Sequence, residues 1–311
     1  MYNSSFTIVG SDGLKTFCHI WKPEDAKNAK AVIQLVHGSI EHIKRYDHFA
    51  SYLVSQGFIV YGHDIRGHGE SISDLSSLAY FSDFDNGFDM CIEEIEEVGT
   101  HIRTNYPNKK LFLFAHSMGT MLARKLLVRH QNYCDGVILS GTGGGRPLLL
   151  SLGIKLAKKS MNKNGRKYRD EKLHKLVYGT LNNQIKNART ASDFISHDDT
   201  VVDAYINDPL CGVTATTEYI YEMLKGIRYV NSTKAYRLTD KNIPILFVSG
   251  ENDPVGGTKC NEVKRIHKKF VKSGNKNSEI KIFTGLRHEI INELSKDEVY
   301  KYCIDWISDK L

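Results

Sequence analysis

The strongest chemical signal in the sequence is a serine in the run FAHSMG (residues 114–119), which lies between an apolar strand pattern and an amphipathic helix pattern. A serine on such a sharp turn stands exposed at the edge of a sheet, and small residues two positions before and after it relieve the crowding. Gly119 fits this spacing, and Ala115 adds one methyl group. The pattern therefore predicts that Ser117 is a nucleophile, with an ordinary turn and a capping serine as the alternative.

A serine hydroxyl attacks a carbonyl group only when a base takes its proton and an acid orients that base. Among the 13 histidines, His288 follows the apolar run 279–283, and Asp253 follows the run 243–248. Sites in open parallel sheets form at the carboxyl ends of strands, where both residues are expected. The order Ser117, Asp253, His288 is that of an α/β-hydrolase. Each partner alone is typical of a surface loop, but together they predict a catalytic triad.

The negative charge that develops on an attacked carbonyl oxygen needs preorganised donors, commonly two backbone amides. One predicted donor is the amide of Met118, directly after the nucleophile. The second is the amide of Ser39, in the loop HGSIEH (residues 37–42) after the first parallel strand. An ordinary glycine turn after a strand is the alternative for this loop.

Apolar runs recur along the chain with the lengths and spacing of strands and helices. The expected strands are residues 6–9, 17–21, 31–36, 58–61, 110–114, 136–139, 243–248 and 279–283. The expected helices are residues 45–56, 86–103, 118–129, 259–271 and 297–307. Such alternation requires crossover connections, so the predicted fold class is α/β, with a mostly parallel central sheet flanked by helices. On the helix 86–103 we expect Glu93, Glu94, Glu96 and Glu97 to face solvent.

The alternation of strand and helix patterns stops after about residue 141 and resumes near residue 241. The intervening segment contains lysine-rich amphipathic stretches and no clear strand. We therefore expect a core domain formed by residues 1–142 and 241–311, with residues 143–240 as a helical insertion between two strands of one sheet.

Five sequence pieces together resemble one branch of the α/β-hydrolases. The pieces are HGSIEH with the following Arg45-Tyr46, GHDIRGHGES (residues 62–71), HSMG (116–119), Asp253-Pro254 and Arg287-His288-Glu289. The chain is similar in these pieces to the monoacylglycerol lipase and lysophospholipase group, classed with serine aminopeptidase S33-type hydrolases. This resemblance implies hydrolysis of lipid or small carboxylic esters without a cofactor or metal, with the insertion acting as a cap.

The sequence departs from this branch at two positions. Ala115 replaces the usual first glycine of the serine turn, and Ile40 stands where relatives often have glycine. At Ile40, the shape of the acyl pocket and the form of the oxyanion loop are therefore not carried over from the relatives. In the run 62–71, by contrast, Asp64, Arg66 and His68 are expected to fix loops through hydrogen bonds rather than to take part in catalysis.

The resemblance also assigns substrate specificity to the cap. Leucines crowd the start of the insertion, as in an apolar helix over an acyl pocket, although they would equally well hold a cap on the core. We expect Ile40, Leu149, Leu152 and Tyr205 to contact the substrate. The main interpretation is a serine carboxylester hydrolase that acts on monoacylglycerols or lysophospholipids through an acyl-enzyme intermediate.

Two alternatives use the same residues. An aminopeptidase or amidase would need an acidic group in the cap to hold an amino terminus; the available acidic residues are Asp198, Asp199, Asp203 and Glu218. A catalytically silent binding protein of the same fold is the other alternative, and the retention of all three triad residues argues against it.

Composition bounds the remaining function classes. With 41% hydrophobic and 25% charged residues, the 311-residue chain is neither disordered nor collagenous. Six scattered cysteines without a C-x-x-C pair indicate neither a zinc site nor a disulfide framework. The sequence shows neither a signal-peptide pattern nor a membrane-spanning apolar run, which favours a cytoplasmic location.

The net charge of +6 is concentrated in the insertion. The segment from Lys155 to Lys175 contains nine basic and only two acidic residues, so the rest of the chain has a net charge of −1. A solvated helix face is the simple explanation. The functional alternative is peripheral contact with an anionic membrane, while no nucleic-acid partner is expected.

Overall fold

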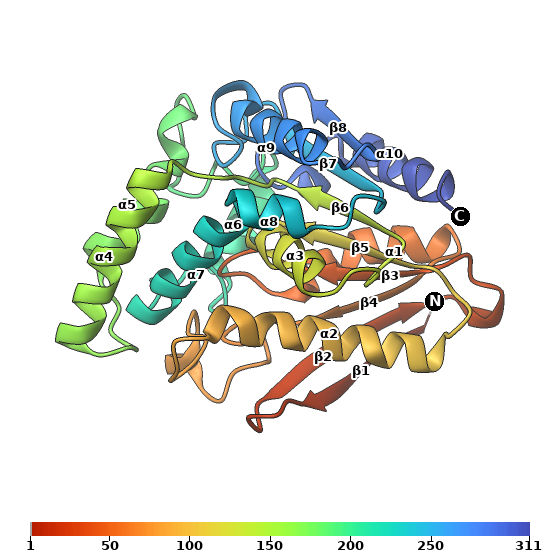
Figure 1. Cartoon of the computed structure of the whole chain (residues 1–311), viewed down its shortest axis with the longest axis horizontal. Coiled ribbons are helices and arrows are strands. Elements are labelled where there is room, and N and C mark those ends of the chain that lie inside the picture. The colour runs from red at the N-terminus through yellow and green to blue at the C-terminus, as the bar shows by residue number, and fades with distance from the viewer. Residues whose placement is uncertain (1) are drawn as a thin grey trace.

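The computed structural model describes residues 2–311, and within them one eight-stranded sheet runs through the molecule (Figure 1). The strand order is β1-β2-β4-β3-β5-β6-β7-β8. The strands are β1 (Tyr2–Val9), β2 (Lys15–Lys22), β3 (Val32–Val36), β4 (Ile59–His63), β5 (Leu111–His116), β6 (Gly136–Ser140), β7 (Ile245–Gly250) and β8 (Ser278–Phe283). Strands β1 and β2 are antiparallel to their neighbours, and β4, β3, β5, β6, β7 and β8 are parallel. The predicted α/β fold with a mostly parallel sheet is confirmed.

Helices cover both faces of the sheet because the central strands are apolar on both sides. The core helices are α1 (Asp47–Ser55), α2 (Gly87–Asn105), α3 (Met118–Arg129), α9 (Asn261–Lys272) and α10 (Lys296–Ser308). Successive residues of β5 point to opposite faces of the sheet and so pack into two different helical layers. Leu113 packs in the core cluster with α2, α3 and α9, whereas Phe112 and Phe114 pack in the cluster with α1 and α10.

Five helices follow β6 and precede β7, within the segment expected to form the insertion. They are α4 (Pro147–Asn164), α5 (Glu171–Tyr178), α6 (Asp199–Asn207), α7 (Thr217–Val230) and α8 (Thr233–Leu238). Helices α4 and α5 lie at one end of the molecule, away from the sheet, with α7 between α4 and the core helices (Figure 1). Helix α7 packs against both α4 and α3, so it links the outer helices to the core.

The expectation that all four glutamates of α2 face solvent is wrong for Glu94. Its side chain is buried, and Glu94 Oε1 accepts a hydrogen bond from Arg66 Nε at 2.7 Å. A buried guanidinium needs a carboxylate partner, and Arg66 enters the core from the loop after β4. Helical periodicity alone cannot reveal such a partner. Arg66 thus fixes its loop, as expected, through Glu94, Asp12 and the carbonyl oxygen of Phe81.

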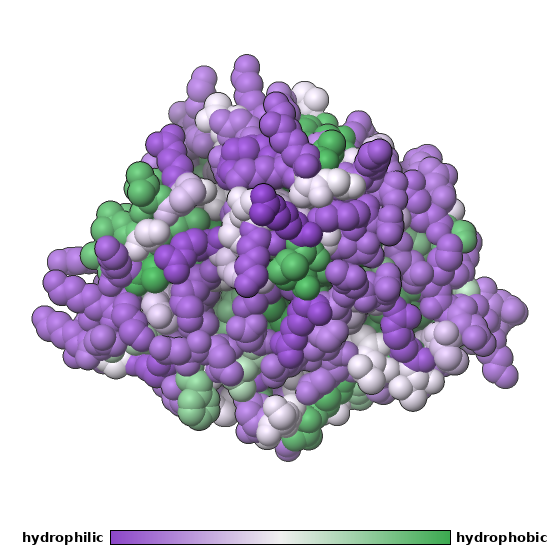
Figure 2. All heavy atoms as spheres, viewed as in Figure 1, coloured by the Kyte–Doolittle hydropathy of each residue, from purple (hydrophilic) through white to green (hydrophobic). Residues whose placement is uncertain are grey.

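No helix within residues 2–311 is both long enough and apolar enough to cross a membrane. The face of the molecule seen in Figure 2 is mostly hydrophilic, but it carries a hydrophobic patch at the end formed by α4. Leu148, Leu149, Leu152 and Leu156 of α4 are among the exposed large hydrophobic side chains.

Candidate active site

Ser117 lies on the sharp turn that the sequence predicts between β5 and α3. Its backbone has φ 50° and ψ −118°, a conformation that L-residues adopt only under constraint. The glycine two residues later makes the turn possible, since a Cβ atom on Gly119 would lie 2.5 Å from the carbonyl oxygen of Val36 and 2.6 Å from that of His37. The Ala115 methyl group is buried in the core and fits without such a conflict.

The structure brings Ser117, His288 and Asp253 into one hydrogen-bonded chain. His288 Nε2 lies 2.9 Å from Ser117 Oγ, and His288 Nδ1 lies 2.9 Å from Asp253 Oδ1. Asp253 follows β7, and His288 lies in the loop after β8, at the carboxyl edge of the sheet where β5 also ends. Asp253 is fully buried, and its Oδ1 also accepts a hydrogen bond from the Val255 amide at 2.9 Å. This geometry is that of a nucleophile, a base and an orienting acid.

The electrostatics of the pair favour a charged Asp253 and a basic His288. Burial alone lowers the pKa of His288, but the carboxylates around it, Asp253 first and then Glu289 and Glu41, outweigh burial and the net shift is upward. Burial raises the pKa of Asp253, but His288 and the Val255 amide outweigh it, so that this pKa is lowered. An imidazole with a raised pKa is a stronger base toward the Ser117 hydroxyl.

The amides of Met118 and Ser39 lie on two segments that converge at Ser117. Met118 is the first residue of α3, so its amide has no intrahelical acceptor. The loop that carries Ser39 approaches the serine closely, because a Cβ atom on Gly38 would lie 3.2 Å from Ser117 Cβ. Neither amide donates a hydrogen bond to another group of the described chain. Within the described residues, each of the two amides is therefore left without a hydrogen-bond acceptor.

A cavity of about 1020 Å³ opens at these residues. Ser117 and His288 lie on its wall, together with all four residues expected to contact substrate: Ile40, Leu149, Leu152 and Tyr205. Most of the other lining side chains that come from the insertion are apolar, such as Leu150, Met223, Leu224 and Ile227. The cavity thus lies between the sheet edge and the helices of the insertion.

The family model Hydrolase_4, described as serine aminopeptidase, S33, matches residues 27–295. This chain belongs to the Hydrolase_4 family. It is 26% identical over 307 residues to a monoglyceride lipase from Mus musculus, with 98% of this chain and 90% of the relative covered. It is also 26% identical over 316 residues to a monoacylglycerol lipase from Mycolicibacterium smegmatis, with 99% and 98% covered. Among solved structures, a thermostable carboxyl esterase from Bacillus coagulans in complex with glycerol matches with a TM-score of 0.90 at 26% identity, and 99% of each chain is covered.

In this Hydrolase_4 chain, a partly buried arginine links the loop that carries His288 to the loop of residues 37–42. Arg45 donates two hydrogen bonds of 2.7 Å to the Glu289 carboxylate and one of 2.5 Å to Glu41 Oε2. Burial alone raises the pKa of Glu289, but Arg45 lowers it to about 2. Glu41 Oε1 in turn accepts the Gly38 amide at 2.6 Å. In the sequence these residues stand out only as motif pieces without a role. The signals that could have indicated one are the position of Glu289 directly after His288 and of Glu41 within residues 37–42.

The four acidic residues available to an aminopeptidase between β6 and β7 are engaged elsewhere. Asp198 caps the N-terminus of α6, and Asp203 pairs with Arg189 at 2.7 Å on the surface. The exposed Asp199 lies 3.5 Å from the same arginine. Glu218 is buried and accepts the Phe81 amide at 2.9 Å. The cavity wall includes none of these four side chains.

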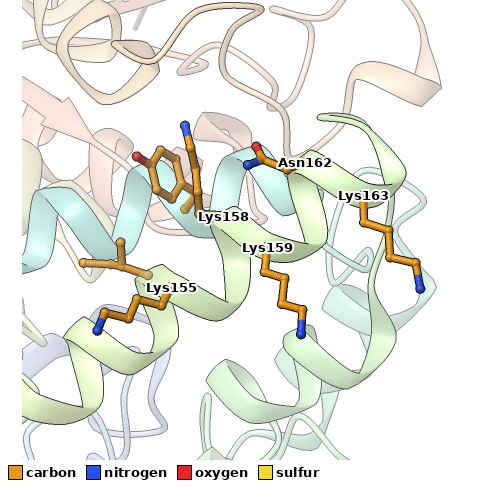
Figure 3. A pocket seen from close by; sticks show the side chains of 7 residues that line it. Lys155, Lys158, Lys159, Asn162 and Lys163 are labelled. Atoms are coloured by element: carbon orange, nitrogen blue, oxygen red, sulfur yellow. The ribbon is translucent and has the colours of Figure 1, made fainter.

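Helix α4 contributes to two different surfaces. Its leucines Leu149 and Leu152 line the cavity yet are 61% and 52% exposed, which places them at the mouth. Further along the helix, an open groove is lined by Lys155, Lys158, Lys159, Asn162 and Lys163 (Figure 3). The lysine groove therefore lies next to the apolar mouth of the cavity.

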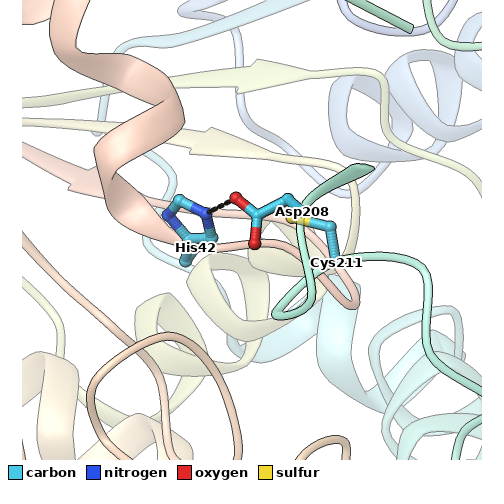
Figure 4. A group of neighbouring side chains, drawn as sticks. All are labelled: His42, Asp208 and Cys211. Carbon is cyan, nitrogen blue, oxygen red and sulfur yellow. Dashed lines mark hydrogen bonds and ion pairs between the residues drawn. The ribbon is translucent and has the colours of Figure 1, made fainter. Parts of the chain in front are cut away.

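Two groups of side chains within the described residues have metal-ligating atoms close together. His42, Asp208 and Cys211 have such atoms within 4.8 Å of one another, and His42 Nε2 is hydrogen-bonded to Asp208 Oδ2 at 2.8 Å (Figure 4). The second group is Glu41, His116 and Glu289, in which Arg45 already pairs with both carboxylates. Because these atoms pair within the protein, we assign a metal to neither group.

Proposed function

We propose that this hydrolase is a serine carboxylester hydrolase that cleaves monoacylglycerols or lysophospholipids through an acyl-enzyme intermediate. The observation that carries the proposal is the hydrogen-bonded chain Ser117–His288–Asp253 on the wall of a large apolar cavity. The lipase names of the relatives support the lipid substrate, since such esters combine an acyl chain with a small polar alcohol.

The proposed reaction uses each group at its observed position. Ser117 Oγ attacks the ester carbonyl carbon while its proton passes to His288 Nε2, and Asp253 stabilises the imidazolium. The amides of Ser39 and Met118 bind the oxyanion. His288 then gives the proton to the leaving alcohol, and the acyl group remains on Ser117. A water molecule, deprotonated by His288, attacks the acyl-enzyme and releases the fatty acid.

The proposal assigns residues 143–240 to a cap and residues 1–142 and 241–311 to the catalytic core. In support, α4 and α7 place apolar side chains on the cavity wall, and Leu149 and Leu152 lie at the mouth. An acyl chain entering there would exchange water for leucine side chains. Ile40 and Tyr205 would contact the ester group or alcohol, because both lie near the oxyanion loop.

The test is a release assay across monoacylglycerols of increasing chain length, lysophosphatidylcholine and aminoacyl amides. We expect kcat/KM for monoacylglycerols to rise about three- to fourfold per methylene group until the cavity is filled, since each buried methylene contributes about 0.8 kcal/mol. Turnover of the amides should be at least about 100-fold lower. Preference for the amides would instead assign an aminopeptidase, and absence of turnover with every substrate would favour the silent binding protein.

We further propose that the α4 end of the molecule rests on an anionic membrane surface. Leu148, the most exposed leucine of the helix at 85%, and its neighbours form an apolar patch (Figure 2). The exposed lysines Lys155, Lys159 and Lys163 follow on the same helix at a four-residue spacing. Leucines entering the interface and lysines facing anionic headgroups would bring the cavity mouth to a membrane-held substrate.

This membrane contact is tested by neutralising the three lysines together as Lys155→Gln, Lys159→Gln and Lys163→Gln. Each lysine near an anionic surface contributes about 1 kcal/mol, so partitioning onto phosphatidylserine-containing vesicles should fall roughly 100-fold in a sedimentation assay. The matched control replaces three exposed lysines of α9 with the same spacing: Lys264, Lys268 and Lys272. Equal binding to phosphatidylcholine-only vesicles, or equal losses in both triple variants, would instead assign the lysines to an ordinary solvated helix face.

A further inference from the structure

The loop that carries the Ser39 amide is held in a strained conformation. Ile40 has φ 55°, in the left-handed region where a β-branched residue is an outlier. A backbone of this kind persists only where surrounding contacts hold it in place. The direction of the neighbouring Ser39 amide therefore depends on the groups that contact this loop.

Two tyrosine hydroxyls from the helices of the insertion hold the Ser39 side chain. Ser39 Oγ lies 2.7 Å from the hydroxyl of Tyr219 on α7 and 2.8 Å from that of Tyr178 on α5. The Tyr219 hydroxyl also lies within hydrogen-bond distance, 3.0 Å, of Met118 Sδ. One fully buried tyrosine thus contacts the side chains of both residues whose amides are the proposed oxyanion donors.

Tyr219 is itself fixed by the core. Burial lowers the pKa of His68 to about 4, so its imidazole is neutral. His68 Nδ1 faces the carbonyl oxygens of Ile65 and Arg66 and must donate to them, which leaves Nε2 as an acceptor 3.3 Å from the Tyr219 hydroxyl. The Tyr219 ring packs on Phe81 with centroids 4.4 Å apart. The hydroxyl therefore has little freedom to follow a loop that relaxes.

The segment from α6 to the start of α7 holds the same loop from its other side. The carbonyl oxygen of Ile40 accepts hydrogen bonds from the Gly212 amide at 3.1 Å and the Tyr205 hydroxyl at 3.2 Å. Two residues later, His42 is hydrogen-bonded to Asp208 (Figure 4). Every one of these contacts comes from between β6 and β7.

We propose that Tyr219, assisted by Tyr178, is a positioning residue that keeps the strained Ile40 loop in the conformation in which the Ser39 amide binds the oxyanion. This inference rests on the proposed ester hydrolysis. It makes the insertion a part of the catalytic geometry as well as a wall of the substrate cavity. The link is specific to hydroxyl groups, since the phenyl ring alone would preserve the packing against Phe81.

The first test is Tyr219→Phe, measured with a monoacylglycerol. One aligned oxyanion donor contributes about 10²- to 10³-fold to kcat, so a misaligned one should lower kcat by about 10- to 100-fold, with KM changed less than about threefold. A boronic acid that forms a tetrahedral adduct with the serine should lose affinity by a similar factor. Tyr229→Phe on the same helix is the matched control and should leave both values unchanged.

The second test is relief of the strain by Ile40→Gly. Glycine adopts positive φ without steric cost, so the loop no longer needs to be held. In the Ile40→Gly background, the added Tyr219→Phe substitution should lower kcat less than about threefold. Ser39→Ala, which removes the other end of the hydrogen bond, should reproduce the Tyr219→Phe loss without changing Tyr219, and combining the two should add little.

Three results would overturn the positioning role: unchanged kcat in Tyr219→Phe, an equal loss in the glycine background, or a change confined to KM. Failure of the proposed function is separately visible. In that case the wild-type protein itself would neither turn over esters nor react with a fluorophosphonate probe. Thermal melting of each variant shows whether a loss of activity reflects loss of the folded state.

Discussion

Replacing Ser117 with alanine is expected to abolish ester hydrolysis and labelling by a fluorophosphonate probe. The structure offers the serine hydroxyl a base at 2.9 Å, and the alanine variant has no oxygen to form the covalent intermediate. In other serine hydrolases, loss of the nucleophile lowers kcat by about 10⁶-fold, and residual catalysis comes from the oxyanion site and binding. Gel fluorescence after labelling, and fatty-acid release under saturating monoacylglycerol, measure the two effects.

The control for Ser117→Ala is Ser308→Ala, which removes an exposed serine of α10. This variant should label and turn over like the wild-type protein. Because an alanine side chain is smaller than the serine it replaces and fits the same turn, melting temperatures of both variants should stay close to that of the wild type. Labelling that persists in the folded Ser117→Ala protein would place the nucleophile elsewhere, and a folded wild-type protein that never labels would favour the silent binding protein.

Replacing Asp253 with asparagine has the second-largest expected effect. The substitution removes the carboxylate that stabilises the His288 imidazolium, and kcat should fall about 10⁴-fold, as in other enzymes with this triad. It should also change the pH dependence. The pKa of His288 is raised by Asp253 against the effect of burial, so wild-type activity should be lost on acidification with a midpoint above the ordinary imidazole value of about 6.5.

In Asp253→Asn, the midpoint of the pH–activity profile should move to lower pH, because burial and the nearby carboxylates act on the pKa of His288 in opposite directions. Activity requires neutral His288, and without the Asp253 carboxylate burial is opposed only by the weaker effects of Glu289 and Glu41, so the pKa of His288 falls. The residual activity should therefore persist to lower pH than in the wild type, measured as kcat/KM from about pH 5 to 9. Glu251→Gln removes another carboxylate from the loop after β7, one that within residues 2–311 accepts a hydrogen bond only from the Gly285 amide, and it should leave the wild-type midpoint in place. An unchanged midpoint in Asp253→Asn would contradict the assignment of Asp253 as the partner of His288.

Local sequence patterns predicted the parts of the site that depend on short stretches of chain. Helix α3 begins and ends at the predicted residues, and the apolar runs before Ser117, Asp253 and His288 are β5, β7 and β8. Since parallel strands align their carboxyl ends at one edge, three residues that each follow a strand could be expected to meet there. The serine turn was visible in the same way, because its crowding restricts residues only two positions away.

The departures from prediction arise from contacts between distant segments. Glu94 lies at a position of α2 that helical periodicity places on the solvent side, but its side chain pairs with Arg66, which comes from the loop after β4. Arg45 and Glu289 are 244 positions apart, and neither sequence neighbourhood identifies the other. Periodicity indicates which face of a helix or strand is buried. It does not indicate which distant segments pack against that face, and buried ion pairs depend on those segments.

The sequence by itself determined the fold class, and it predicted the sharp turn at Ser117 and the order of Ser117, Asp253 and His288, because strand periodicity and turn sterics act over a few neighbouring residues. Only the tertiary structure decided how the loop of residues 37–42 is held. Ile40 adopts a positive φ although its side chain disfavours it, and Ser39 is hydrogen-bonded to Tyr219, 180 positions along the chain. A backbone conformation that local preferences oppose is stabilised by contacts from elsewhere in the fold, and these contacts exist only once the segment between β6 and β7 has packed on the sheet edge.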